Sequence, residues 1–303
     1  MVTGLLHGLF FAAALVSGQD DAPQSAVEPA ESPPDIVVTG DREEMERTVR
    51  AITRKITERR HFSRPLPRFQ VPVCLATVGL RDDYKSLIRQ RIGANLVAAD
   101  IPVDDDPECR PNALVVFAPD ARKAVREMIK EQPWLFTGYS NSQKRDLTQR
   151  EAAAYAWQTT DLRGADGKPL KKMIIEVGIP PEKKEVIVND QGQTGRTNQP
   201  IREDIAGAVV VIDNRELPGK TIDQLADYAT MRLVATTRDA EGEDAGGIGE
   251  QTILSLFDAP DVAPEELTDF DRSYLTGLYR LRANAPVTAL QDAASKAYRE
   301  LSD

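Results

Sequence analysis

Two aspartates that lie four residues apart, Asp223 and Asp227, are the first candidates for chemistry in this sequence. They stand in TIDQLADYATMRL (residues 221–233), whose apolar residues recur at helical spacing after the run AGAVVVID. Carboxylates at positions i and i+4 lie on the same side of a helix, where their oxygens suit a cation. The pair is therefore a candidate set of metal ligands.

A structural role explains Asp223 equally well. Thr221 and Gln224 have the spacing of a capping box, so Asp223 falls in the first helical turn, where unpaired amides favour negative charge. Asp227 lacks such an explanation, because like charges four residues apart slightly destabilise a helix. A hydroxyl, an arginine or a hydrated cation beside Asp227 would compensate. We favour the structural interpretation for both residues.

The last third of the chain carries three segments in a suggestive order. TIDQLADYATMRL is followed by TILSLF (252–257) and then by LTDFDRSYLTGLY (267–279). This order is similar to the catalytic half of metzincin-type zinc proteases. The resemblance places Asp223 and Asp227 at the first two zinc-ligand positions, Gln224 at the position of the glutamate base, and Leu233 at the third histidine.

Every catalytic position in that resemblance is replaced. Catalytic zinc sites depend on imidazole nitrogen, and Gln224 cannot accept a proton from water as a carboxylate does. The resemblance therefore implies a degenerate zincin-like, protease-like scaffold that carries no catalytic residue and needs no cofactor.

A second resemblance covers residues 69–303. The spacing around Cys109 and Asn112, the Ala-Trp-Gln at Trp157 and the terminal LT-FD-YL-LY pattern resemble exported bacterial proteins of uncharacterised function. This resemblance implies a protein of the cell envelope or the medium.

Composition limits the chemistry further. The formal net charge of −10 over 303 residues argues against nucleic acid as a partner. The two histidines are His7 and His61, and His61 lies in the basic, proline-broken connector RRHFSRPLPRF. The two cysteines, Cys74 and Cys109, are most simply a disulfide if the chain is exported.

Export itself is predicted from the start of the chain. Residues 1–18 have a short apolar core followed by small residues, which is typical of a signal peptide, and their removal would leave His61 as the remaining histidine. Residues 19–34 are acidic and rich in proline, so we expect a disordered spacer. No other segment is long and apolar enough to span a membrane. We expect the periplasm or the medium as the location.

A short β-prone segment follows the spacer. DIVVTGDRE resembles the segment near the start of many TonB-dependent outer-membrane receptors, and an exposed strand there suits addition to the sheet of a partner. A strand of this chain's own sheet, or a chance match, is the interpretation that we favour. The candidate partner strand consists of Asp35, Ile36, Val37, Val38, Thr39 and Gly40.

The rest of the chain alternates between strand and helix patterns, which predicts an α/β fold with a mixed sheet. We expect a short strand, a helix and a basic connector over 35–68, a disulfide-linked βαβα portion over 69–137, and a zincin-like portion with packing helices over 138–303. Within these, a helix is expected over 139–158. In the helix that begins near residue 82, the side chains expected to point inward are Leu87, Ile88, Ile92 and Leu96.

Three functions remain open from the sequence. The first is an exported, non-catalytic binding or scaffolding protein. The alternative is a metal-dependent hydrolase that uses Asp223 and Asp227. The third is a partner of the TonB machinery in the cell envelope, acting through residues 35–40.

Overall fold

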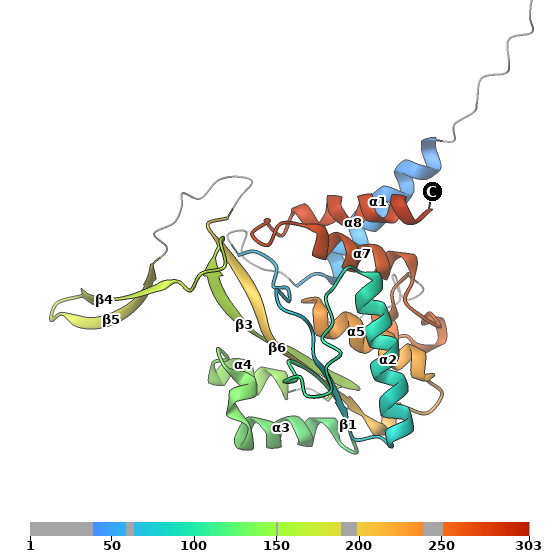
Figure 1. Cartoon of the computed structure of the whole chain (residues 1–303), viewed down its shortest axis with the longest axis horizontal. Coiled ribbons are helices and arrows are strands. Elements are labelled where there is room, and N and C mark those ends of the chain that lie inside the picture. Colours follow the sequence, from blue (N-terminus) through green and yellow to red (C-terminus); the bar gives the residue numbers. More distant parts are fainter. Residues whose placement is uncertain (1–38, 59–63, 150, 189–198, 239–250, 303) are drawn as a thin grey trace, which may run out of the picture. The chain divides into compact units, whose positions relative to one another are not determined.

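Four strands form the central sheet of the computed structural model, which describes residues 39–58, 64–149, 151–188, 199–238 and 251–302 (Figure 1). Two parallel pairings and one antiparallel pairing connect the strands. The predicted α/β class with a mixed sheet is therefore confirmed. The strand order is β1 (Leu75–Val78), β2 (Ala113–Ala118), β6 (Ile201–Asp213) and β3 (Ala154–Gly164), with β3 antiparallel to β6.

The central strand β6 is buried on both faces, which explains its continuous apolar run. Val209 and Val211 point into one hydrophobic core, whereas Val210 and Ile212 point into the other. Because successive side chains alternate across a strand, one apolar run supplies both layers.

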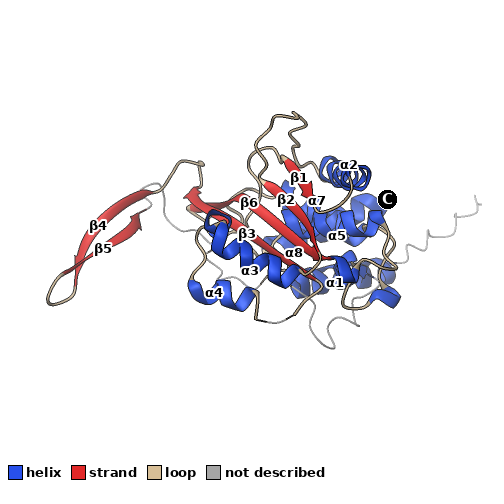
Figure 2. Ribbon diagram, turned by 90° about the horizontal axis from the view of Figure 1, so that it is seen from below, coloured by secondary structure: helices blue, strands red, loops and turns tan. Residues whose placement is uncertain are grey.

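Helices cover both faces of the sheet (Figure 2). Side chains of five helices contribute to the larger core, and three shorter helical segments lie over the other face. The first group is α1 (Thr39–Ile56), α2 (Asp82–Ala98), α5 (Ile222–Val234), α7 (Asp269–Arg280) and α8 (Ala289–Ser302). The second group is α3 (Ala121–Glu131), the 3-10 helix η1 (Pro133–Phe136) and α4 (Asn141–Leu147). Short 3-10 helices also occur at Asn214–Glu216, Ile253–Ser255 and Pro260–Val262.

A second sheet consists of two antiparallel strands, β4 (Lys171–Val177) and β5 (Glu182–Val188), between β3 and β6 in the chain. Within the part of the chain that the structure describes, no helix is both long and apolar enough to cross a membrane.

The expected helix over 139–158 is wrong in its second half. Helix α4 ends at Leu147, and the Ala-rich stretch that follows enters β3 at Ala154. Tyr155 and Trp157 point into the same core, which is the two-residue period of a strand. Pairing with β6 therefore overrides the helical propensity of alanine.

The inward face expected for α2 is wrong at one position. Ile88, Ile92 and Leu96 are buried, but the side chain of Leu87 is 49% exposed. Each residue turns a helix by about 100°, so Leu87 lies off the stripe that Ile88 begins. Asn95 takes the additional buried position.

The N-terminal predictions fall largely outside the described residues. These are the signal peptide (1–18), the spacer (19–34), His61 and four residues of the candidate partner strand. The other two, Thr39 and Gly40, are the first residues of α1 and thus helical rather than extended. The acidic residues that follow them favour a helix N-terminus.

The portions expected over 69–137 and 138–303 share one sheet, because β6 pairs with both β2 and β3. Residues 40–303 accordingly form a single compact unit.

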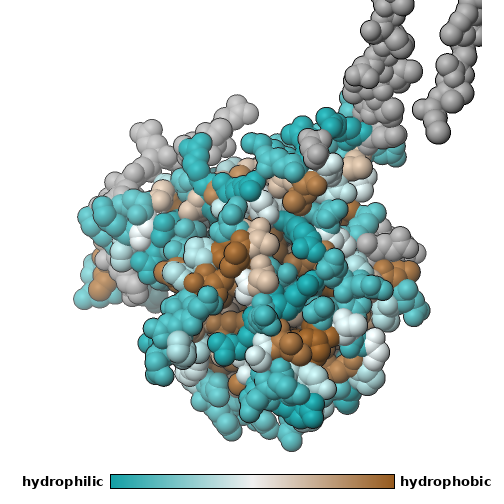
Figure 3. All heavy atoms as spheres, turned by 45° about the vertical axis from the view of Figure 1, so that its right-hand side comes forward, coloured by the Kyte–Doolittle hydropathy of each residue, from teal (hydrophilic) through white to brown (hydrophobic). Residues whose placement is uncertain are grey.

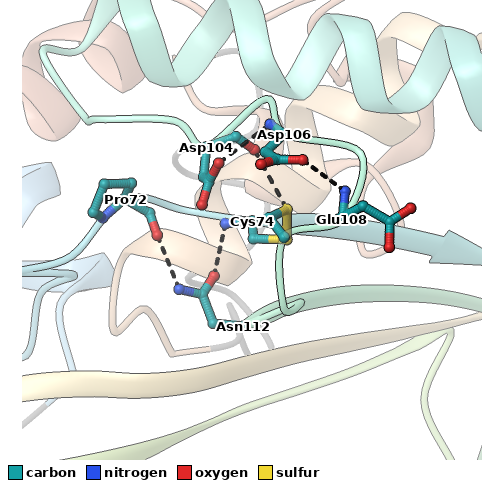
Figure 4. The surroundings of a disulfide bond; sticks show 7 residues. Pro72, Cys74, Asp104, Asp106, Glu108 and Asn112 are labelled. Atoms are coloured by element: carbon teal, nitrogen blue, oxygen red, sulfur yellow. Dashed lines mark hydrogen bonds between the residues drawn. A yellow bond between two sulfur atoms is a disulfide. The ribbon is translucent and has the colours of Figure 1, made fainter.

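The predicted disulfide between Cys74 and Cys109 is present, with a Cα–Cα distance of 6.1 Å (Figure 4). Asn112 extends the pairing of β1 and β2 beyond the strands. Its side-chain Oδ1 accepts from the backbone N–H of Cys74 at 2.9 Å, and its Nδ2 donates to the carbonyl of Pro72 at 3.0 Å. The disulfide and Asn112 together hold one end of the edge strand β1 against β2.

Asp213, the last residue of β6, connects the sheet to α3. Its buried Oδ2 accepts from the backbone N–H of Ala121, the first residue of α3, at 2.9 Å. Arg215 donates from Nε to Oδ1 at 2.9 Å and from Nη2 to Oδ2 at 2.8 Å. The Arg215 guanidinium, supported by the backbone N–H groups of Ala121 and Arg215, lowers the pKa of Asp213 to about 2.

This carboxylate should make the fold sensitive to acid. Because its folded-state pKa of about 2 lies below the ordinary value of 3.8, it stabilises the fold above about pH 4, and this contribution disappears as the pH falls toward 2. We expect the difference in unfolding free energy between wild type and Asp213→Asn to shrink by about 2 kcal/mol across that range. Urea denaturation of both proteins at a series of pH values measures this difference. A difference that does not change with pH would contradict the lowered pKa of Asp213.

Candidate functional site

Asp227, one of the two candidate metal ligands, is completely buried, with 0% of its surface exposed. Arg91 of α2 donates to it twice, from Nε to Oδ1 and from Nη2 to Oδ2, both at 2.8 Å. Asn95 donates from Nδ2 to Oδ1 at 2.6 Å, and the backbone N–H of Leu267 donates to Oδ2 at 2.7 Å. Each carboxylate oxygen therefore accepts two hydrogen bonds.

These four bonds use the acceptor capacity of the carboxylate, which is about four lone-pair sites. Of the three compensating groups expected beside Asp227, the structure contains the arginine. Hydrogen bonding to Asp227 is the main cause that raises the pKa of Arg91 above its ordinary value. A cation at Asp227 would have to displace the guanidinium. Among the residues that the structure describes, no cluster of three or more His, Cys, Asp or Glu is placed to hold a metal ion.

The remaining positions of the zincin-like resemblance have structural contacts of their own. Asp223 is exposed in the first turn of α5. Gln224 forms the predicted capping box with Thr221, and its Nε2 donates to the carbonyl of Pro264 at 2.9 Å. Leu233 is buried in the larger core. Asp223 lies near Arg91, the partner of Asp227, whereas Gln224 contacts Pro264 and Leu233 packs in the core, so the four positions do not form one set of ligands.

A second buried carboxylate, Asp271 within the segment LTDFDRSYLTGLY, holds the segment 252–257. Asp271, in the first turn of α7, accepts from the Thr252 hydroxyl at 2.6 Å and from the backbone N–H of Ile253 at 2.8 Å. The backbone N–H and the hydroxyl of Thr268 each donate to it at 3.1 Å. Burial raises the pKa of Asp271 to about 6, and these hydrogen bonds oppose the shift. This segment is therefore fastened to α7.

A polar pocket of about 290 Å³ lies at the C-terminal end of α5, the end opposite Asp223. It is lined by β3, by β6, by the C-terminal residues of α5 and the residues just after it, and by residues 137–139. Trp157 forms part of its wall, and this ring stacks on Phe136 with centroids 4.7 Å apart. The Trp157 Nε1 donates to the carbonyl of Leu135 at 2.9 Å. The wall is consequently fixed by packing on the smaller core.

Gln158 connects this pocket to α5. Its Nε2 donates to the carbonyls of Leu233 (2.8 Å) and Ala235 (3.2 Å), and its Oε1 accepts from the Thr236 hydroxyl at 2.9 Å. The side chain satisfies carbonyls that the end of a helix leaves without intrahelical partners. Strand β3 and the C-terminus of α5 therefore form one rigid wall.

Charged groups of both signs line the pocket. The carboxylate of Glu203 in β6 accepts from the Thr160 hydroxyl at 2.7 Å and lies 3.8 Å from the guanidinium of Arg64. The Arg232 guanidinium, also largely buried, donates from Nη1 to the carbonyl and the hydroxyl of Thr237, both at 3.2 Å. Such a lining offers hydrogen-bond donors and acceptors to a polar group.

The pocket opens beside a free strand edge. The backbone N–H of Ala208 donates to Asn112 on the β2 side, so Ala208 and its opposite residue Gln158 are a pair without mutual hydrogen bonds. The backbone groups of Gln158 and Ala156 therefore point away from β6, and no described strand pairs with this edge. The Tyr139 hydroxyl donates to the carbonyl of Gln158 at 3.3 Å.

A larger hollow of about 820 Å³ lies between α2, β1 and the disulfide loop. Two of the charged side chains that line it, Asp82 and Lys85, pair with each other at 2.5 Å. Figure 3, which brings the α2 side of the molecule forward, shows hydrophobic surface only in patches separated by hydrophilic side chains. This hollow lacks the buried charges that distinguish the pocket beside β3.

The candidate residues predicted from the sequence do not include the buried charges of the pocket, Arg232 and Glu203, or the partner of Asp227. Arg232 in ATMRLVA and Glu203 in the strand pattern before AGAVVVID are charged residues within or beside apolar runs. A charged residue inside or beside an apolar run needs a buried partner, and this requirement marks both residues as candidates for a site. The pairing of Asp227 with Arg91 has no local signal, because 136 residues separate them.

Comparisons with known proteins give no match: no protein-family model matches the chain, and neither does any curated protein or solved structure.

The two aspartates of α5 should differ sharply in their contribution to stability. Asp227→Asn leaves the Arg91 guanidinium without its buried counter-charge, so we expect the free energy of unfolding to fall by about 3 to 5 kcal/mol. The matched control Asp223→Asn changes an exposed first-turn carboxylate and should cost about 1 kcal/mol or less. Chemical denaturation of both variants measures the difference. Equal stability, together with zinc bound by wild type and not by Asp227→Asn, would contradict the structural role.

Proposed function

We propose that this chain is an exported, non-catalytic binding protein that takes an extended peptide segment along the free edge of β3. One side chain of the peptide enters the polar pocket beside Gln158. Backbone hydrogen bonds to the edge provide affinity in this mode of recognition, and a side-chain pocket provides specificity.

The observation that carries the proposal is the position of the pocket next to outward-facing backbone groups. Ala156 and Gln158 line the pocket and also belong to the set of residues whose N–H and C=O groups point away from β6. A peptide strand paired there would place alternate side chains toward the pocket, because side chains alternate along a strand. The buried Glu203 and Arg232 then favour a polar side chain with both donors and acceptors.

The contacts of α5 support binding rather than catalysis. Asp227 holds Arg91, Gln224 holds Pro264, and Leu233 packs in the core. A hydrolase that uses Asp223 and Asp227 would require a metal to compete with a bidentate guanidinium in a buried site. The architecture of the helix is therefore better suited to positioning the pocket.

Export is supported by the disulfide, because such bonds persist in oxidising compartments. The TonB-partner hypothesis rests on residues 35–40, of which the structure describes Thr39 and Gly40 alone. It stays a prediction, which pull-down from envelope extracts with and without residues 35–40 would test.

A proline at Ala156 should weaken peptide binding and leave the fold intact. Ala156→Pro removes an N–H that faces the free edge, so no bond to β6 is lost, and proline is tolerated on edge strands. We expect the affinity for extended peptides to fall by at least about tenfold. The probes are short fluorescein-labelled peptides in a Val/Thr-rich frame that differ only at the central residue, and binding is read by fluorescence anisotropy.

The control Ala156→Ser keeps the amide and should bind like wild type. Thr160→Val removes one hydroxyl at the pocket and should change which central residue is preferred, without abolishing binding. The proposal is overturned if wild type binds none of the peptides, or if Ala156→Pro binds them as well as Ala156→Ser does.

A further inference from the structure

The hollow between α2, β1 and the disulfide loop has a volume of about 820 Å³, which falls in the range of small-molecule sites, roughly 300–1,000 Å³. Leu75, Ala76 and Thr77 of β1 line it. Thr77 is 8% exposed, and its buried hydroxyl oxygen has no hydrogen-bond partner among the described residues. Because buried hydroxyls are normally hydrogen-bonded, this group is available to a ligand.

The backbone of β1 offers further hydrogen-bonding groups to the hollow. The N–H of Ala113 in β2 donates to the carbonyl of Cys74, and the backbone groups of successive residues alternate between the two sides of a strand. The N–H and C=O groups of Leu75 and Thr77 therefore point away from β2. Strand β1 is an outer strand of the sheet, and no described strand pairs with this side of it.

A short segment of the chain itself shows how this edge can be used. Val73 donates to the carbonyl of Pro102 at 2.8 Å and accepts from the N–H of Asp104 at 2.9 Å, so residues 102–104 run parallel to the start of β1. No described backbone continues this pairing along Leu75 and Thr77. An extended ligand in the hollow would continue it in the same direction.

Unpaired charges of opposite sign line the hollow from two sides. The guanidinium of Arg89 belongs to α2, and the carboxylate of Asp105 belongs to the disulfide loop. Neither side chain has an ion-pair or hydrogen-bond partner within the described ranges of the chain. Lys85 of α2, in contrast, already pairs with Asp82. A ligand that carries both an ammonium and a carboxylate group complements the two unpaired charges.

Gly93 leaves space on the helical side of the hollow. Glycine destabilises the interior of a helix relative to alanine. A Cβ atom at Gly93 would meet no atom within 4 Å, so close packing does not require a glycine there. Gly93 lines the hollow, and its missing side chain keeps that part of it open.

We propose that this hollow binds a short peptide with free termini, of two or three residues, parallel to β1. The ligand residue opposite Ala76 donates its N–H to the carbonyl of Leu75 and accepts from the N–H of Thr77, which is the parallel pattern. Its amino end then lies toward Asp105 and its carboxylate toward Arg89. The parallel direction fits these charges, because residues 102–104 pair at the start of β1 and α2 begins just after β1 ends.

This site is independent of the peptide site proposed at β3. Strands β1 and β3 are the two outer strands of the four-stranded sheet, so the two ligands occupy opposite edges. Ala156→Pro should accordingly bind a ligand of the hollow like wild type.

Blocked peptides test the charge pairing in isothermal titration calorimetry. We expect wild type to bind trialanine at least about tenfold more tightly than N-acetyl-trialanine or trialanine amide. Arg89→Gln should lose the preference for trialanine over its amide and keep the preference over the acetylated peptide. Asp105→Asn should show the reverse. Wild type that binds all three peptides equally, or none of them, overturns the proposal.

Filling the hollow tests its location. Gly93→Leu places a side chain in the open space and raises the helix propensity of α2, so we expect a folded protein whose affinity for trialanine falls by at least about tenfold. Circular dichroism checks that the variant is folded. A folded Gly93→Leu that binds trialanine like wild type overturns the proposal, as does binding of inorganic phosphate without binding of trialanine.

Discussion

The buried carboxylate of Asp227 constrains the arrangement of the helices around it. A charge removed from water is tolerated only with a counter-charge and hydrogen bonds, and Arg91 on α2 together with the backbone of Leu267 before α7 provides them. Three segments far apart in the chain must therefore meet at one point. Hydrophobic packing alone would tolerate small shifts between these helices, whereas a bidentate ion pair accepts one geometry.

The ion pair at Asp227 fixes the position of α5, and α5 in turn positions the residues of the pocket at its C-terminal end. The N-terminal half of the helix is held by Gln224 and Asp227, and its C-terminal carbonyls are held by Gln158 of β3. Arg232, in the last turn, is thereby placed against the same strand that carries the free edge. A binding site built on a helix fixed at both ends needs little rearrangement when it takes a ligand, which lowers the entropy cost of binding.

Local sequence patterns are sufficient to predict some elements of this structure and insufficient to predict the others. The strand–helix alternation predicts the α/β class, and the presence of two cysteines in a chain expected to be exported predicts their disulfide. The stretch that contains Ala154 reads as helix from composition, and only its pairing with β6 makes it a strand. The partner of Asp227 and the approach of Glu203 to Arg64 depend on tertiary packing, so no spacing in the sequence reveals them.

The edge of β3 has features that limit indiscriminate pairing. At β3 the Tyr139 hydroxyl occupies one edge carbonyl, and the pocket beside Gln158 discriminates among incoming side chains. An edge beside a pocket suits a partner whose side chain fits that pocket.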